Sequence, residues 1–174
     1  MLIDPFEGTF EDIDQYARKI RTAFLNMFPK YKEQFHVRSF FEEIVDFLGG
    51  SIKVEENPEP YEIAGGSLFV QPDRSFVVYL SPLTSPLRDN FTIAHELGHY
   101  FIHLPSKFEK TLVFARDGSS LVEKQANRFA GAFLIPRDEL ILKKEEFQNN
   151  KYLIADYFGT SIPALEYRRR ELGI

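Results

Sequence analysis

Residues 91–100 read F-T-I-A-H-E-L-G-H-Y, and the H-E-x-x-H core inside them constrains the chain more than any other stretch. His95 and His99 lie four residues apart, so on a helix both rings project from one face and can reach one metal ion. Glu96 follows the first histidine and is placed to take a proton from metal-bound water without itself binding the metal. The pattern predicts a helix with two zinc ligands, His95 and His99, and a general base, Glu96.

A second helical stretch, Glu123–Leu134, is where a third ligand can be sought. Gly98 costs helix propensity, which predicts a close approach by another backbone to the first helix. Glu123, in the first turn of the second helix, could then point its carboxylate at the metal. The alternative is that Glu123 only closes its own helix end, because Ser120-x-x-Glu123 is also a capping box. Small residues that would let the second helix lie close to a neighbour are Ala126, Ala130 and Gly131.

His103 is a rival third ligand, four residues past His99. It lies roughly 12 Å from His95 along a helix axis, too far for both rings to meet one ion at about 2 Å. The chain contains no cysteine, so a metal site must be built from histidines and carboxylates. We therefore expect a His-His-Glu site made of His95, His99 and Glu123, with zinc as the metal.

Composition sets the remaining limits. With 174 residues, of which 44% are hydrophobic, the chain can bury a full core and is expected to form essentially one domain. The N-terminus has no signal-peptide pattern, and no apolar run approaches 18 residues. Together with the absence of cysteine, this predicts a soluble, cytoplasmic protein with no membrane contact. The net charge of -5 argues against broad affinity for nucleic acid.

Apolar spacing and caps predict three helices before residue 104. Apolar residues recur at three and four residues from about Thr9 to Met27. A capping box of Ser39 and Glu42 predicts a second helix over Phe40–Leu48, closed by two glycines. A serine followed by proline predicts the start of the motif helix, which we expect to run from Ser85 to about His103.

Strand signals lie between the second helix and the motif helix. Residues 67–70 and 75–80 are rich in β-branched and aromatic types and flank a turn at 72–74, which predicts a hairpin. Residues 51–54 are a candidate third strand, and the acidic stretch 55–62 reads as a solvated loop. This order predicts an α+β, zincin-like fold, mostly helical with a small antiparallel sheet of about three strands.

Two motifs together resemble the ImmA/IrrE family of metallopeptidases. Residues 88–103 read R-x-x-F-T-I-A-H-E-L-G-H-x-x-x-H, and residues 123–136 read E-x-x-A-N-x-F-A-G-A-F-L-I-P. The resemblance implies that His95, His99 and Glu123 are zinc ligands and that Glu96 is the catalytic residue. Family members are known for cleaving helix-turn-helix repressors, which releases genes of mobile elements or of a damage response, and others are paired with repressor or antitoxin genes.

The C-terminal segment, residues 151–174, reads as helix, glycine turn, cap and helix, a spacing similar to a helix-turn-helix. We therefore divide the chain into a metallopeptidase domain, 1–150, and a helical appendage, 151–174, packed on the same domain. From Arg137 onward seven basic residues face seven acidic ones, which makes direct DNA binding the weaker interpretation. A packing or substrate-docking role is favoured, and the candidate docking residues are Tyr157, Leu165, Tyr167 and Arg168 to Arg170.

The metal-ligand pattern predicts a zinc-dependent endopeptidase, and the family resemblance implies that it makes a specific cut in a helix-turn-helix repressor encoded nearby. An exposed edge of the small sheet could hold the substrate in an extended form. The alternative is a non-catalytic regulator that binds a repressor or antitoxin and uses zinc structurally. Glu96 favours the enzyme, because a closed structural site needs no base. Sequence alone does not choose the oxyanion-stabilising group among Tyr100, His103, Asn127 and Arg128.

Overall fold

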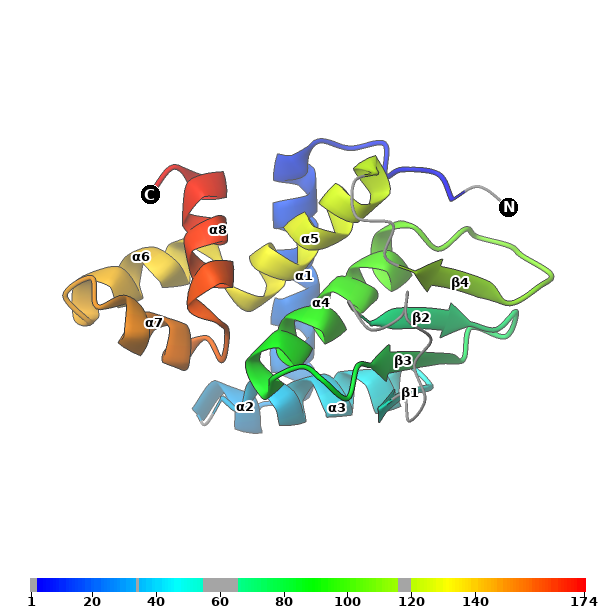
Figure 1. Ribbon diagram of the computed structural model, residues 1–174, viewed down its shortest axis with the longest axis horizontal. Helices are drawn as coiled ribbons and strands as arrows, with labels where there is room; N and C mark the ends of the chain where they lie inside the picture. The colour runs from blue at the N-terminus through cyan, green and yellow to red at the C-terminus, as the bar shows by residue number, and fades with distance from the viewer. Residues whose placement is uncertain (1–2, 34, 55–65, 116–119) are drawn as a thin grey trace.

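The computed structural model describes residues 3–33, 35–54, 66–115 and 120–174. These ranges form a mostly helical α+β fold, with a small sheet at one end, helices α6 to α8 at the other, and α4 between them (Figure 1). The predicted fold class is confirmed. The elements are α1 (Phe10–Met27), α2 (Lys30–Glu33), α3 (Val37–Phe47), β1 (Gly50–Val54), β2 (Ser67–Val70), β3 (Phe76–Leu80), α4 (Pro86–Ile102), β4 (Leu112–Ala115), α5 (Leu121–Leu134), α6 (Arg137–Glu146), α7 (Lys151–Tyr157) and α8 (Ile162–Leu172).

The sheet has the strand order β1-β3-β2-β4. Strands β2 and β3 form the predicted antiparallel hairpin, whose turn is closed by Gln71 N–H donating to the Ser75 carbonyl at 2.8 Å. Two details differ from the prediction. Strand β1 pairs with β3 in parallel, and β4 adds a fourth strand antiparallel to β2, so the sheet is mixed. Periodicity identifies a strand but does not specify its partner, which is set by tertiary packing.

Helix α1 begins where the sequence predicts. The Thr9 hydroxyl accepts from Asp12 N–H at 3.1 Å, and the Asp12 carboxylate accepts from Thr9 N–H at 2.8 Å, forming a capping box. Helix α4 likewise begins after Ser85, whose hydroxyl accepts from Arg88 N–H, and ends with His103 at its C-cap. Both predicted helices are confirmed.

The predicted start of α3 is wrong. The helix begins at Val37, three residues before the predicted position, so Ser39 lies inside its first turn. His36 occupies the N-cap position without a side-chain cap, and its carbonyl accepts from Phe40 N–H at 2.9 Å. Glu42 is engaged with Arg38 at 2.8 Å, a pair one helical turn apart. Burial of Val37 extends the apolar stripe backwards past the serine.

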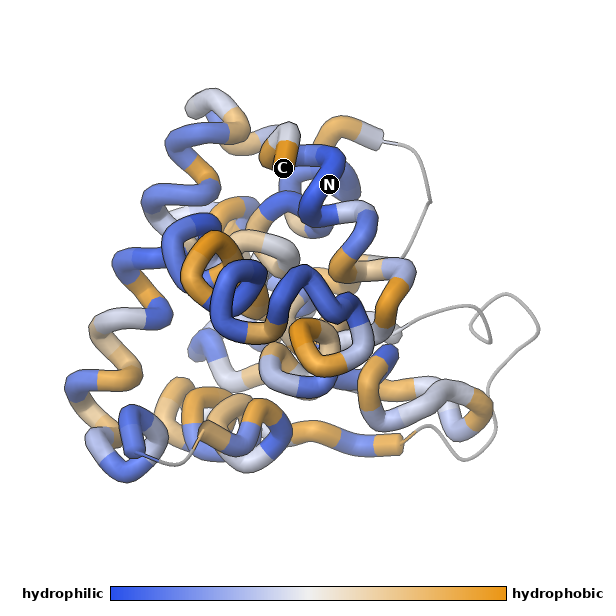
Figure 2. Tube along the Cα trace, turned by 90° about the vertical axis from the view of Figure 1, so that its left-hand side faces the viewer, coloured by the Kyte–Doolittle hydropathy of each residue, from blue (hydrophilic) through white to orange (hydrophobic). Residues whose placement is uncertain are grey.

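The core lies where α1, α3 and α5 meet α4 and the sheet. Phe129 and Phe133 of α5 stack on one another at a centroid separation of 6.0 Å, and Phe133 also stacks on Phe40 and Phe41 of α3. Figure 2 shows hydrophobic and hydrophilic residues alternating along the outer helices, as expected when one stripe of each helix is buried. No helix in the described ranges is long and apolar enough to cross a membrane. The predicted acidic loop, 55–62, lies outside the described residues.

Gly98 is a point of close backbone approach between α4 and α5. A Cβ at this position would lie 3.2 Å from the Ala126 carbonyl oxygen and 3.2 Å from the Phe129 Cβ. Ala126 and Ala130 are fully buried. The close approach that the sequence predicts at Gly98 is therefore confirmed, and it brings the helix with both histidines against the helix with Glu123.

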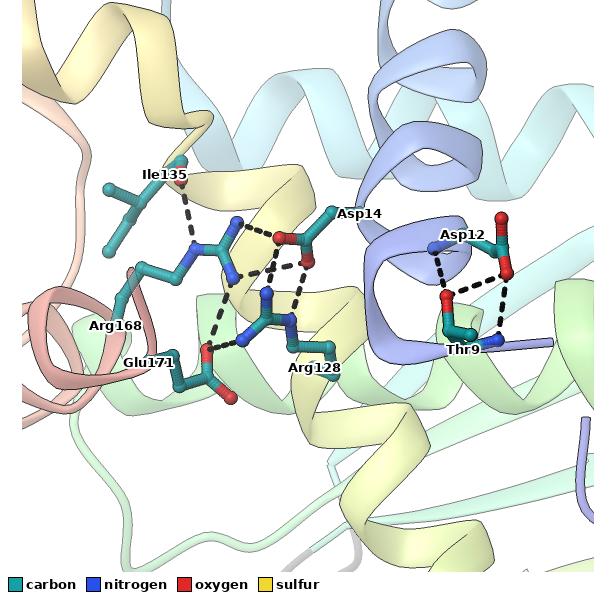
Figure 3. Close-up of polar contacts among 7 residues, drawn as sticks. All are labelled: Thr9, Asp12, Asp14, Arg128, Ile135, Arg168 and Glu171. Carbon is teal, nitrogen blue, oxygen red and sulfur yellow. Dashed lines mark hydrogen bonds and ion pairs between the residues drawn. The ribbon is translucent and has the colours of Figure 1, made fainter. Parts of the chain in front are cut away.

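Helix α8 is held to the rest of the chain by a buried ionic cluster (Figure 3). Asp14 of α1 accepts hydrogen bonds from both Arg128 of α5 and Arg168 of α8, at 2.6 to 3.2 Å. Arg168 is 1% exposed and also donates to the Ile135 carbonyl at 3.3 Å, at the end of α5. Glu171 completes the cluster at 3.2 Å from Arg168. The cluster thus ties α1, α5 and α8 together.

The docking surface proposed for the C-terminal helices needs correction. Leu165 and Arg168 are buried, Leu165 in the core and Arg168 in the ionic cluster, so neither can be presented to a partner. Tyr167 and Arg170 are exposed. The turn between α7 and α8 is anchored as well, because Asn90 of α4 donates its amide to the Gly159 carbonyl at 2.9 Å. Leu165 and Arg168 therefore serve packing within the chain and are removed from the proposed docking surface.

Candidate metal centre

Three side chains from two helices converge on one point. The Nε2 atoms of His95 and His99, both on α4, lie 3.1 Å apart. The Glu123 carboxylate of α5 lies 3.4 Å from Nε2 of His95 and 3.1 Å from Nε2 of His99. Ligands bound tetrahedrally to zinc at about 2.0 Å are separated by roughly 3.3 Å, so these spacings fit one ion. The three buried residues could hold a metal ion.

Asn127 fixes the orientation of the first histidine. Its Oδ1 lies 2.9 Å from Nδ1 of His95. An amide oxygen only accepts, so His95 donates from Nδ1–H and keeps the lone pair of Nε2 directed at the centre. A partner of this kind holds the ring orientation that metal binding needs. The sequence motif contains Asn127, but this role was not predicted from it.

His103 lies beside the centre but outside the ligand set. Its Nδ1 faces Nδ1 of His99 at 3.1 Å, on the side of the His99 ring away from Nε2. Its Nε2 lies 3.1 Å from Oε1 of Gln125 on α5. Burial lowers the pKa of His103 to about 4, which keeps the ring neutral at pH 7. The exclusion of His103 on helix geometry agrees with this placement.

Glu123 has a backbone cap and a side-chain partner at once. Its N–H donates to the Ser120 hydroxyl at 3.2 Å, as the capping alternative requires. Its carboxylate nevertheless points at the two histidines. Burial alone would raise the pKa of this carboxyl, but the contacts with His95 and His99 outweigh burial and hold the pKa well below its usual range. An ionised carboxylate is the form that binds a metal.

Glu96 is buried on α4, with 1% of its surface exposed. Gly66, the residue before β2, lies near it. A Cβ on Gly66 would lie 3.4 Å from Oε1 of Glu96, 2.3 Å from Cγ2 of Thr92 and 2.7 Å from the Tyr79 carbonyl oxygen. Thr92 and the Tyr79 carbonyl leave no room for a side chain here, so Gly66 brings bare backbone next to the Glu96 carboxylate.

The candidate oxyanion-stabilising residues are mostly engaged elsewhere. Arg128 is bound to Asp14, while Asn127 and His103 are bound to the imidazoles of the centre. The Tyr100 hydroxyl lies 3.5 Å from the Arg74 carbonyl, and its ring packs on Phe76 at 4.6 Å. Arg128 is thereby removed from the set, because its guanidinium is committed to the ionic cluster.

Strand β4 lies directly beside the centre and was not predicted. The Phe114 ring packs on the His99 ring at a centroid distance of 4.9 Å. Leu112 and Phe114 are buried whereas Val113 is 45% exposed, the alternation of a half-buried strand. The signal exists in the sequence, but four residues are too few to stand out by periodicity. Within the described residues β4 pairs with β2 alone, so it forms an edge of the sheet.

The model of the IrrE N-terminal-like domain, a peptidase family, matches residues 52–170 and so includes both helices of the centre. The chain belongs to this family. The recognition made from the two sequence motifs is thereby confirmed.

The fold is similar to that of solved structures. A Mycobacterium tuberculosis transcriptional regulator superposes with a TM-score of 0.53 at 19% identity, over 89% of this chain and 50% of that one. The chain thus spans half the length of that structure. No curated protein matches the sequence. At this identity the likeness establishes a shared fold, and the IrrE-like domain match carries the connection to metallopeptidases.

Proposed function

We propose that this IrrE-like chain is a zinc-dependent endopeptidase with His95, His99 and Glu123 as metal ligands. The observation that carries the proposal is the convergence of two imidazole Nε2 atoms and one carboxylate at 3.1 to 3.4 Å. Two nitrogens and one oxygen suit zinc, and three protein ligands leave the fourth position that catalytic zinc sites keep open. Zinc held there would polarise a scissile carbonyl and acidify a water molecule.

Glu96 is assigned the role of general base. It follows a ligand directly in the sequence and is buried, so its carboxylate is shielded from bulk water. Gly66 is the backbone neighbour on one side of it, since a Cβ on Gly66 would lie 3.4 Å from Oε1 of Glu96. In this role Glu96 accepts a proton from the attacking water and later delivers it to the leaving amine.

Strand β4 is the proposed docking edge for the substrate backbone. It is an edge strand among the described residues, and Phe114 links it to the ring of His99. A peptide added in extended form along this edge would pass close to the metal ligands. Main-chain hydrogen bonds would supply affinity, and exposed Val113 would contact alternate side chains of the peptide.

We further propose a helix-turn-helix repressor encoded nearby as the substrate and the cytoplasm as the place of action. The substrate assignment rests on the family resemblance, and the cytoplasm on the absence of cysteine from the sequence. Direct DNA binding remains disfavoured, because Arg168 of the helix-turn-helix-like segment is consumed by the ionic cluster.

Incubating the wild type and Glu96→Gln with that repressor tests the proposal. We expect both proteins to hold about one zinc per chain, and only the wild type to yield two fragments in mass spectrometry. The Gln variant is the matched control, because it keeps the shape of the side chain and loses its basicity. Equal fragments from both proteins would show that Glu96 is not the general base of the reaction. Binding of the repressor by both without any fragment would support the non-catalytic regulator.

A further inference from the structure

We propose that Gln125, held by the backbone of Phe6, sets the proton positions on His103 and His99 and thereby keeps Nε2 of His99 available to a metal. The inference rests on the proposed metal centre and adds a positioning residue to it. Gln125 touches no metal ligand itself. It acts through a chain of hydrogen bonds, here called the Gln125 chain, which runs from Phe6 through Gln125 and His103 to His99.

The first link fixes which end of the Gln125 amide faces which group. Phe6 N–H donates to Oε1 of Gln125 at 2.9 Å, and Nε2 of Gln125 donates to the Phe6 carbonyl at 2.8 Å. Backbone groups have fixed roles, so turning the amide over would set donor against donor and acceptor against acceptor. The amide orientation is therefore determined by the main chain and not by the histidine.

The second link determines where His103 carries its proton. Its Nε2 lies 3.1 Å from Oε1 of Gln125, which can only accept. His103 must therefore be protonated at Nε2. A neutral imidazole has one N–H, so Nδ1 of His103 is left as an acceptor.

The third link determines which nitrogen of His99 carries a proton. The Nδ1 atoms of His103 and His99 lie 3.1 Å apart, so one proton lies between them. If His103 supplied it, His103 would be a cation with 5% exposure between an amide oxygen and another imidazole, an unfavourable place for a charge. If His99 supplies it, both rings are neutral and Nε2 of His99 keeps its lone pair. The second arrangement matches what a zinc ligand requires.

The Gln125 chain complements the role of Asn127. Both residues lie on α5, as does Glu123, so one helix provides a ligand and the partners that orient both histidines of α4. Gln125 is 3% exposed and its amide is fully engaged. If Gln125 served only to tie Phe6 to α5, its loss would lower stability and leave the histidine protons where they are.

Nitrogen-15 NMR of the histidine rings tests the inference without any variant. The chain has four histidines, so the long-range proton–nitrogen spectrum can be assigned in full. We expect His103 to be protonated at Nε2 alone, with and without zinc, and His99 to be protonated at Nδ1 in the zinc-loaded protein. A proton on Nδ1 of His103 in either form would overturn the proposal. The zinc-free spectrum decides this even if the protein were to bind no zinc, an outcome that would defeat the proposed function separately.

A pair of variants then measures the effect on the metal. Gln125→Met removes the amide at similar length, and Lys124→Met, at the exposed neighbouring position, is the matched control. We expect zinc affinity, read by competition with a chromophoric chelator, to fall about 10- to 100-fold in the first and to stay unchanged in the second. Circular dichroism checks that both are folded. If the Gln125→Met variant were folded, bound zinc with wild-type affinity and kept the proton of His103 on Nε2, Gln125 would only join Phe6 to α5.

Discussion

Glu123 satisfies two demands at one residue, since its backbone is capped by Ser120 while its carboxylate faces the histidines. The two alternatives that the sequence leaves open are therefore compatible. The cap fixes the first turn of α5, and the fixed turn directs the side chain. Separating the two contributions requires variants at both positions.

Glu123→Ala should abolish tight zinc binding, because one of the three proposed ligands, and the only anionic one among them, is lost. We expect an affinity loss greater than the 10- to 100-fold typical of residues that only orient ligands. Ser120→Ala is the matched control. It should cost about 1 kcal/mol of unfolding free energy through loss of the cap and leave zinc content intact. Metal analysis of both proteins decides, and full zinc in Glu123→Ala would return Glu123 to the role of a helix cap.

The proposed site residues that the sequence pattern suggests most directly are those whose relation is local. His95, Glu96 and His99 lie within one helical turn, so their spacing carries the information. Glu123 was reached through the small residues that let two helices approach. Asn127 and Gln125 lie in the same motif, but their roles depend on contacts across the α4–α5 interface that no spacing within one helix reveals.

At the scale of elements, the α4–α5 interface sets the geometry of the centre, and Gly98 sets the interface. Gly98→Ala gains about 1 kcal/mol of helix propensity but places a methyl 3.2 Å from the Ala126 carbonyl. Overpacking of this kind costs about 1–3 kcal/mol. We expect a net destabilisation of about 1 kcal/mol in urea unfolding, together with weaker zinc binding. A more stable variant with unchanged zinc affinity would show that the helices can separate without consequence.

The ionic cluster makes a second prediction about elements. Arg168→Met should destabilise the protein by about 3 kcal/mol, the low end of the range for breaking a buried pair, because Arg128 still pairs with Asp14. Arg170→Met is the control on the same helix, exposed and outside the cluster, and should change the free energy of unfolding by less than about 0.5 kcal/mol. Chemical denaturation of both variants provides the comparison. Equal stability would mean that Arg168 contributes no more than a surface charge.

Elements were predicted well where the signal lies within the element. The caps at Thr9 and Ser85 gave the starts of α1 and α4, because each cap bonds to its own first turn. The capping pattern at Ser39 predicted the wrong start for α3, because burying Val37 against the core stabilises a longer helix by more than a cap at Ser39 would. The parallel pairing of β1 and the presence of β4 depend on contacts made elsewhere in the chain.

For the whole molecule, metal binding should appear as stability. A ligand that binds only the folded state adds about 4 kcal/mol when its free concentration is 1,000 times Kd. For a chain of this length that corresponds to a rise in Tm of roughly 8–16 °C over the protein in EDTA. Differential scanning calorimetry checks this, with Glu123→Ala as the control that should show no rise. A wild-type protein with the same Tm in zinc and in EDTA would contradict the proposed centre.

The packing of α1 against α5 also has a consequence for synthesis. About 90 residues separate the two helices, which at about 5–20 residues per second means that α1 leaves the ribosome roughly 5–20 s before its main partner exists. Glu123 lies in that same late helix. The centre is therefore incomplete until α5 has been made, and nascent chains stalled before Leu121 should leave α1 open to proteolysis and bind zinc weakly. The proposed metal centre therefore has no complete set of ligands in a nascent chain until α5 has been synthesised.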